Sequence, residues 1–149
     1  MAFQTVAGST LSVSIAAPAT QTAVGFAALT WTVVGELTDV PTVLGREYNI
    51  VTHSPVSSAQ VTQKKGSYTL PQADAMCAWD DLDAGQLIIK SASEDNSVVS
   101  FKLQKQDGKI RYFTAQVSKF IEEFGTVDNV VTGSFSLLRQ TNTITAPAV

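Results

Sequence analysis

The sequence predicts a mainly β fold: a β-sandwich or barrel-like domain with one flanking α-helix and a long loop or hairpin insertion. Apolar residues alternate with Ser, Thr and Gln in the period of a half-buried strand. This alternation occurs near residues 9–16, 98–104, 110–121 and 130–138. Another stretch, residues 80–95, has helical periodicity instead. At 149 residues the chain is expected to form a single domain, residues 1–149, with a core of its own.

The N-terminal strands come first in the predicted order. STLSVSIA, residues 9–16, places its Leu, Val and Ile on one face and its serines on the other. LTWTVVGEL, residues 29–37, continues the alternation with Trp31 and Val33 on the apolar side. Residues 22–30 break the period and predict a short helical turn before the second strand.

The insertion is predicted over residues 40–71. This stretch contains Pro, Gly and only short β-like pieces, so it is expected to be a long loop carrying a loose hairpin with Lys64-Lys65-Gly66 at its tip. A connection of this length in a compact domain usually acts outside the domain.

A strand followed by a helix is predicted next. AMCAW, residues 75–79, alternates its small apolar side chains inward. The helix over residues 80–95 has an apolar stripe of Leu and Ile, with Asp80 or Asp81 able to cap its first N–H groups. Asp83 favours the positive end of the helix dipole.

The hairpin between residues 97 and 120 allows its register to be predicted. A two-residue Asp-Gly turn would place Phe101 opposite Thr114 and mix the two faces. A three-residue loop, with Gly108 in the left-handed conformation, places Phe101 opposite Phe113 and keeps the faces separate. Because only the three-residue loop keeps apolar residues opposite apolar residues, the sequence predicts this loop.

The second face of these strands is neutral and polar. Its predicted members are Ser100, Thr114, Gln116, Ser118, Thr132, Ser134 and Ser136. In the predicted register Lys102 joins this face, whereas Lys119 falls on the apolar one. The chain has 31 serines and threonines and only 15% charged residues, so much of its surface is uncharged and polar. Long uncharged strands with open edges aggregate unless they are covered, and this favours pairing between copies of the chain.

Composition also limits the function. A formal charge of −3 and a pI of about 5.0 argue against a basic groove that grips nucleic acid. The single cysteine, Cys77, excludes an internal disulfide framework and fits a reducing compartment. The first 20 residues do not have the pattern of a signal peptide, and no apolar run is long enough to span a bilayer, so we expect a soluble protein made in a cytosol.

We identify no catalytic, cofactor-binding or metal-binding residues. His53 has no partner residues near it in sequence, Cys77 alternates into an apolar face, and no G-x-S-x-G motif occurs. The aspartates at the predicted helix start lack the calcium-loop spacing, which favours helix capping over a metal site. Glu122 and Glu123 are adjacent on a strand and should point in opposite directions, unlike a glycosidase pair.

The order of several segments resembles the major tail tube protein family of long non-contractile-tailed bacteriophages, or siphophages. These segments are GFAALTWTVVGELTDV, GREYNIVTHSPVSS, KKGSY, DDLDAGQLIIKSA, DGKIRYFTAQVSKF and VDNVVTGSFSLL. The resemblance covers the chain from about Thr10 to Leu138. It rests on strand and helix patterns and not on chemical motifs.

The resemblance implies a structural virion protein that is not an enzyme and needs no cofactor. Six copies would form a ring, their inner sheets would join into one continuous barrel, and the rings would stack into the channel for DNA ejection. The neutral face would line this channel, and double-stranded DNA would pass without specific binding. Other partners would be the tape measure, tail terminator and distal tail proteins, with no membrane. The protein would be made in the host cytoplasm and end in the virion.

The resemblance also implies which segments contact neighbouring copies. Residues 40–71 would form an inter-subunit loop, and residues 139–149 a flexible C-terminal arm. The loop residues expected at the contact are Arg46, Glu47, Tyr48, Lys64, Lys65 and Gly66. The alternative function is a non-catalytic binding module, such as an adhesin, a carbohydrate-binding domain or a capsid decoration protein. Such a module would need a cluster of exposed aromatic residues, whereas Trp31 and Trp79 are expected to point inward.

Overall fold

The structure is a computed structural model that describes residues 3–41 and 43–147. Its elements in chain order are β1 (Thr10–Ser14), α1 (Ala23–Ala27), β2 (Thr32–Val34), β3 (Leu37–Asp39), β4 (Glu47–His53), β5 (Thr62–Thr69), β6 (Ala73–Ala78), α2 (Ala84–Ser93), β7 (Val98–Gln104), β8 (Ile110–Glu123), β9 (Thr132–Arg139) and β10 (Ile144–Ala146). The mainly β fold class is confirmed, and α1 joins α2 as a second, shorter helix.

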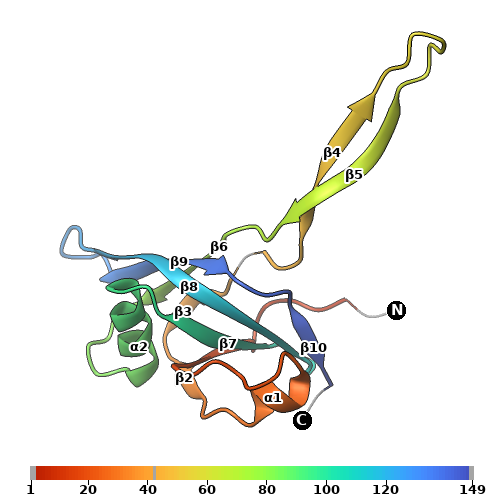
Figure 1. Ribbon diagram of the computed structural model, residues 1–149. Helices are drawn as coiled ribbons and strands as arrows, with labels where there is room; N and C mark the ends of the chain where they lie inside the picture. Colours follow the sequence, from red (N-terminus) through yellow and green to blue (C-terminus); the bar gives the residue numbers. More distant parts are fainter. Residues whose placement is uncertain (1–2, 42, 148–149) are drawn as a thin grey trace.

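Within the described residues, most strands belong to one antiparallel, eight-stranded sheet (Figure 1). Its order is β2-β1-β7-β8-β9-β6-β3, and β10 pairs with β8. β2 and β3 lie at opposite edges of the sheet, although only Gly35 and Glu36 separate them in the chain. The sheet must therefore curl until its two edges meet. This makes the body barrel-like, as the sequence predicted.

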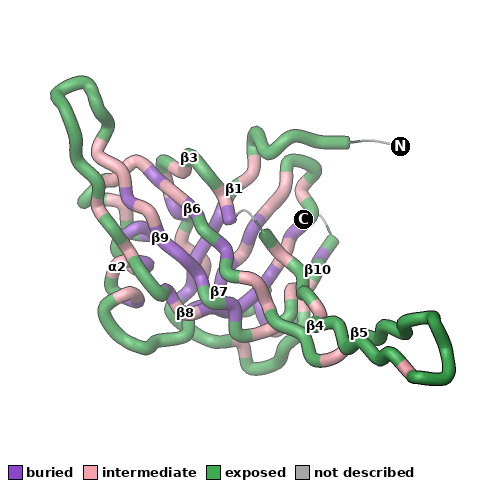
Figure 2. The backbone as a smooth tube through the Cα atoms, turned by 90° about the horizontal axis from the view of Figure 1, so that it is seen from above, coloured by how far each residue is buried: buried purple, intermediate pink, exposed green. Residues whose placement is uncertain are grey.

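The main core lies inside the curled sheet, where α2 packs against β8, β2 and β1 (Figure 2). Phe101 and Phe113 face each other across β7 and β8 and stack with their ring centroids 5.4 Å apart. Phe120 and Phe135 stack in the same way across β8 and β9, at 6.1 Å. Cross-strand aromatic pairs of this kind stabilise a sheet beyond the area they bury.

The predicted register of the β7–β8 hairpin is confirmed. Phe101 pairs with Phe113, and the Lys105 N–H donates to the Lys109 carbonyl to close a three-residue loop. Gly108 has a φ of 88°, in the left-handed region that glycine adopts without steric cost. The two faces of the hairpin therefore stay separate, and the aromatic pair lies in the core.

The N-terminus of α2 is fixed by Asp83 and not by Asp80 or Asp81, which corrects the prediction. One Asp83 carboxylate oxygen accepts from the N–H of Gly85 (3.0 Å), and the other accepts from the N–H of Gly35 (2.6 Å). The same side chain thus caps the helix and holds the connection between β2 and β3. A Cβ at position 85 would lie 2.5 Å from the Val33 carbonyl oxygen, so only glycine allows α2 to approach β2 this closely.

A second apolar cluster covers one end of the opposite face of the sheet. Phe26 of α1 stacks on Tyr112 of β8 with ring centroids 5.1 Å apart, and Ile110 and Ala146 complete the cluster. The C-terminal segment, expected as an arm over residues 139–149, begins inside β9 and continues into β10, which pairs with β8. Its described residues belong to the body; residues 148 and 149 lie outside the described part of the chain.

β4 and β5 form a separate two-stranded sheet that projects from the body (Figure 1). The predicted tip at Lys64-Lys65-Gly66 is wrong, because these residues lie inside β5 and residues 54–61 form the turn. Gly66 sits in the strand where the β4–β5 pairing shifts register. A Cβ there would meet the Val51 side chain at 3.1 Å, so this glycine serves a close strand approach.

Candidate assembly surfaces

The predicted polar face is covered by the chain itself at one end. The Ser100 hydroxyl donates to the Ala16 carbonyl (2.7 Å), and the Thr114 and Thr141 hydroxyls lie 3.0 Å apart. Both Ser100 and Thr114 are buried. In the single chain these two residues face backbone and side chains of neighbouring segments, so they do not belong to an open surface.

Ser136 is also buried, although it lies on a more open part of the same face. Its hydroxyl donates to a carboxylate oxygen of Asp74 on the neighbouring strand β6 (2.6 Å). This hydrogen bond, with a second one from Gln72, lowers the pKa of the Asp74 carboxyl. Asp74 itself is exposed, so the surface beside Ser136 carries a negative charge, whereas the sequence predicted a neutral polar surface there.

The remaining four predicted residues are accessible. Ser118 is exposed, and Gln116, Thr132 and Ser134 are half-buried. They lie on β8 and β9, on the face opposite the main core. This accessible area of β6, β8 and β9 is called the open face below.

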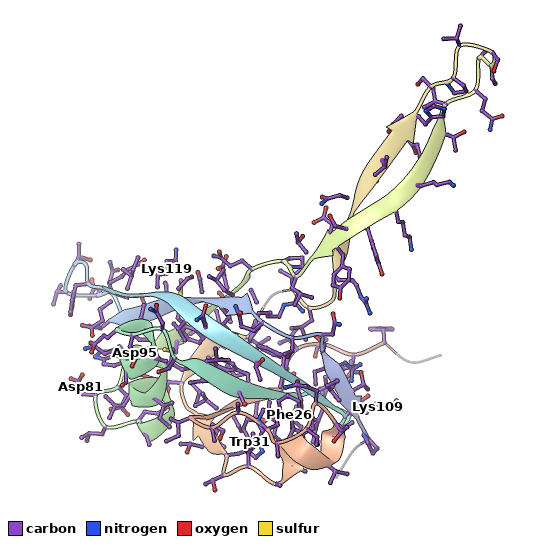
Figure 3. The ribbon with its side chains drawn as sticks, viewed as in Figure 1. Phe26, Trp31, Asp81, Asp95, Lys109 and Lys119 are labelled. Carbon is purple, nitrogen blue, oxygen red and sulfur yellow. The ribbon has the colours of Figure 1, made fainter. Side chains whose placement is uncertain are left out.

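A β-bulge changes the composition of the open face. The β8–β9 register shifts between Val117 and Lys119, so Lys119 pairs with Ser136 and joins the polar side, where it is exposed (Figure 3). The prediction that Lys119 lies on the apolar face is therefore wrong. A bulge inserts one extra residue and reverses the alternation beyond it, which no period-two pattern anticipates.

Carboxylates outnumber cations on the open face. A shallow hollow of about 230 Å³ is lined by Lys119, Asp39 and Asp74, together with Ser134 and Ser136. Further along β8, Glu123 pairs with Thr132 and is exposed. One cation among three carboxylates makes a surface that does not attract phosphate strongly.

A cation–aromatic cluster occupies one face of the β4–β5 hairpin. The Tyr48 and Tyr68 rings pair across the strands with centroids 5.5 Å apart. The Arg46 guanidinium lies 4.8 Å from the Tyr68 centroid, and the Lys65 ammonium lies 4.7 Å from the Tyr48 centroid. Lys64, opposite Val51, is exposed. The predicted contact residues thus share the hairpin, with Glu47 exposed and Gly66 half-buried.

Arg139, which is not among the residues predicted from the sequence, anchors the hairpin to the body. Its side chain is buried, and its guanidinium donates to the Pro71 carbonyl (3.2 Å), to the Thr143 hydroxyl (3.3 Å) and to the Gly45 carbonyl. Gly45 and Pro71 flank the two ends of the hairpin. Burial lowers the pKa of the guanidinium. The signal available in sequence was an arginine ending an otherwise uncharged strand.

The residues considered for catalysis lie apart. His53 is exposed at the end of β4, and Cys77 is buried, where desolvation raises the pKa of its thiol to about 11. Glu122 pairs with Lys90 of α2 (2.8 Å), whereas Glu123 points to the other face, as predicted. Within residues 3–41 and 43–147, no group of three or more His, Cys, Asp or Glu is placed to hold a metal ion. The helices in the same residues are too short to cross a membrane.

Comparison with known proteins identifies relatives by fold and not by sequence. No family model matches the chain, and no curated protein matches it. A chain of the anti-feeding prophage (AFP) baseplate, in a sixfold-symmetrised structure, superposes with a TM-score of 0.66 and 8% identity, covering 98% of this chain and 97% of that one. A chain of the PVC sheath–tube complex, an extracellular contractile injection system in its extended state, gives 0.57 and 9%, covering 95% and 88%.

The chain shares its fold with components of these two assemblies. This agrees with the tail-tube-like fold that the sequence resemblance implied. The resemblance named long non-contractile tails, whereas the second structure belongs to a contractile system. The likeness therefore supports a tail-tube-like fold and not the siphophage family in particular.

Proposed function

We propose that the chain is a structural, non-catalytic subunit of a phage tail tube or a related tail-like tube. Copies of the chain assemble into hexameric rings, and the rings stack around a channel. The observation that carries this proposal is the β4–β5 hairpin, which projects from the body and is exposed along nearly its whole length. A two-stranded sheet with apolar and cationic side chains is only marginally stable in water, so a function that covers it is favoured.

The open face supplies the channel wall in this proposal. Gln116, Ser118, Thr132 and Ser134 are its accessible neutral polar residues. Lys119, Asp74 and Glu123 lie beside them, and the exposed Ile121 lies opposite Ser134. Such a wall neither binds phosphates strongly nor presents a continuous apolar surface to DNA, so ejected double-stranded DNA slides along it without specific binding. Ser136 is buried within this wall and donates to Asp74, whereas Ser100 and Thr114 lie at the covered end of the polar face, outside the wall.

The proposed partners follow from the position of such a subunit in a tail. Ring faces bind the next ring, and the ends of the tube meet a distal tail protein and a tail terminator, with a tape measure protein inside during assembly. The protein is made in the cytoplasm of a bacterial host and is retained in the virion. More specifically, the sequence resemblance supports a role in the tail of a siphophage.

The alternative of a binding module has less support. The indole N–H of Trp31 donates to the Phe26 carbonyl (3.0 Å) within the second apolar cluster. Trp79 packs edge-on against Phe120, at 5.2 Å between centroids. Both side chains are half-buried in the body, so neither forms a flat platform for a sugar ring.

Electron microscopy of the purified full chain tests the proposed function. We expect sixfold rings or hollow tubes in a concentration series, and analytical ultracentrifugation should show a species of six subunits or larger. A monodisperse monomer at every concentration, without rings on the grid, would contradict the proposal. A stable dimer with an isologous interface would contradict the hexameric ring.

A further inference from the structure

The outer face of α2 carries an apolar groove that none of the residues in 3–41 and 43–147 covers. Ile89 and Ala92 turn into the main core, while Leu87 turns outward and is 44% exposed. Together with Ile15, which is 74% exposed, Leu87 lines a groove of about 260 Å³ that runs along the helix to Asp95. Exposed apolar surface of this kind, bordered by polar residues, is typical of a protein-binding site.

Asp95 lines this groove, and further carboxylates lie at the two ends of α2. Residues 80–95 contain Asp80, Asp81, Asp83, Glu94 and Asp95. The single cation of the same stretch, Lys90, is engaged with Glu122 at 2.8 Å. The groove is therefore apolar along its floor and negatively charged at both ends of the helix, and a matching partner must carry apolar side chains and cations together.

The β4–β5 hairpin has this combination. Residues 46–70 contain three cations and one carboxylate, a formal charge of +2, and since the whole chain carries −3, the rest carries −5. The exposed apolar side chains of the hairpin include Ile50, Val51 and Val61, and Ile50 is 67% exposed. The hairpin thus has the charge opposite to that of the α2 groove.

The two surfaces lie at opposite ends of the molecule. In Figures 1 and 2 the hairpin extends away from the body on the side opposite α2, and Figure 3 places Asp81 and Asp95 beside α2, far from the hairpin. Intramolecular docking is excluded by this geometry. A hairpin at one end and its acceptor at the other define a head-to-tail contact, which repeats from copy to copy and closes into a ring or continues along a stack.

We propose that the β4–β5 hairpin of one copy docks on the α2 groove of a second copy of this chain. Val51, which shares one face of the hairpin with its cross-strand partner Lys64, covers Leu87 and Ile15, and the hairpin's cations face the carboxylates at the ends of α2. The inference rests on the proposed tube function and names the acceptor of the hairpin. Burial of the apolar floor supplies the affinity, and the opposed charges select the orientation and suppress contacts between like ends.

The test uses paired charge reversals in the full chain. K64E/K65E makes the hairpin acidic, and D81K/E94K makes the acceptor basic. All four side chains are exposed or lie on the surface of their elements, and neither Asp81 nor Glu94 accepts a side-chain hydrogen bond within the described residues. Each variant alone places like charges across the contact. The concentration for half-maximal assembly, followed by light scattering and electron microscopy, should rise by about tenfold or more.

Mixing the two variants restores opposite charges at every contact when copies alternate. An equimolar mixture should assemble at nearly the wild-type concentration, and so should the chain carrying all four reversals. K105E/K109E changes the net charge by the same amount as K64E/K65E at the distant β7–β8 turn, and it should assemble like the wild type. Circular dichroism and thermal unfolding of each variant exclude misfolding as the cause of any loss.

The outcomes separate the two proposals. If the wild type forms no rings or tubes, the tube function fails. If the wild type assembles and the reversed variants do so equally well, the docking inference alone is overturned, and α2 faces a different partner. If both variants are defective but neither the mixture nor the quadruple variant recovers, the hairpin and α2 contact different surfaces, and the inference is again wrong.

Discussion

The body and the β4–β5 hairpin use the same cross-strand chemistry in opposite environments. In the body, the Phe101–Phe113 pair stacks at 5.4 Å and is fully buried. In the hairpin, the Tyr48–Tyr68 pair lies at 5.5 Å, but cations cover its rings in place of a core. The hairpin therefore gains the pair contact without the burial, which supplies most of the free energy of folding.

The body and the hairpin are therefore expected to have different roles. The body folds through its own core, whereas the hairpin keeps apolar side chains that the other described residues leave exposed. Arg139 joins the two regions through backbone carbonyls at both ends of the hairpin. Substitutions in the body should therefore change stability, and substitutions in the hairpin should change association.

The largest effect on stability is expected from Phe135→Ala in the body. Phe135 is 1% exposed and stacks on Phe120, so the substitution leaves a cavity and should lower the free energy of unfolding by about 3–5 kcal/mol. Val56→Ala at the hairpin turn, where the side chain is fully exposed, should change it by less than about 0.5 kcal/mol. Urea denaturation followed by circular dichroism measures both, and similar losses would mean that the hairpin belongs to the core.

The next largest effect on stability is expected at Gln86, where the two edges of the sheet meet. Gln86 is fully buried; its amide donates to the carbonyls of Gly35 and Ala78 (2.9 Å each) and accepts from the Asp80 N–H (2.8 Å). Gln86→Leu keeps the volume but leaves these backbone groups without partners, so the free energy of unfolding should fall by about 2–3 kcal/mol.

Gln63→Leu on exposed β5 is the matched control for this substitution, and it should be nearly neutral in the same urea titration. A neutral Gln86→Leu would show that water or backbone movement satisfies the three groups. In that case Gln86 would not be what holds α2 to the closing edge of the sheet.

The sequence predicted those features that two independent local signals determine together. The β7–β8 register follows from loop length and from the two faces at once, because any other loop would mix Phe101 with Thr114. The fold class follows from alternation repeated over several strands. Each of these predictions depends on neighbours in the chain, and each is confirmed.

Features that depend on distant segments were not predictable in this way. Ser100 has the same local pattern whether its hydroxyl faces water or the Ala16 carbonyl, 84 positions away in the chain. The bulge that moves Lys119 has no marker in the sequence. Gly66 resembled a turn glycine, but it serves a close approach of Val51 within a strand. Arg139 donates to the Gly45 carbonyl, 94 positions away in the chain, which no periodicity reveals.

A smaller effect is expected at the junction between the two regions. Arg139→Met removes the donors to the Gly45 and Pro71 carbonyls, and should lower the free energy of unfolding by about 1–2 kcal/mol. The same change should accelerate amide hydrogen exchange at the root of the hairpin more than at its turn. Arg111→Met is the control, because the side chain of this half-buried arginine donates to the Ile110 carbonyl of its own strand and not to the hairpin. Unchanged exchange at the root would show that strand pairing alone orients the hairpin.

The smallest effect on stability is expected from Ser134→Arg on the open face. Ser134 is half-buried beside the hollow that holds Asp74 and Lys119, so a long side chain can extend into solvent and the free energy of unfolding should change by less than about 0.5 kcal/mol. Ser100→Arg is the contrasting variant, because it would force a cation beneath Ala16 and should cost more than about 3 kcal/mol. Equal losses in thermal unfolding would mean that both ends of the polar face are closed, and the open face could not then line a channel.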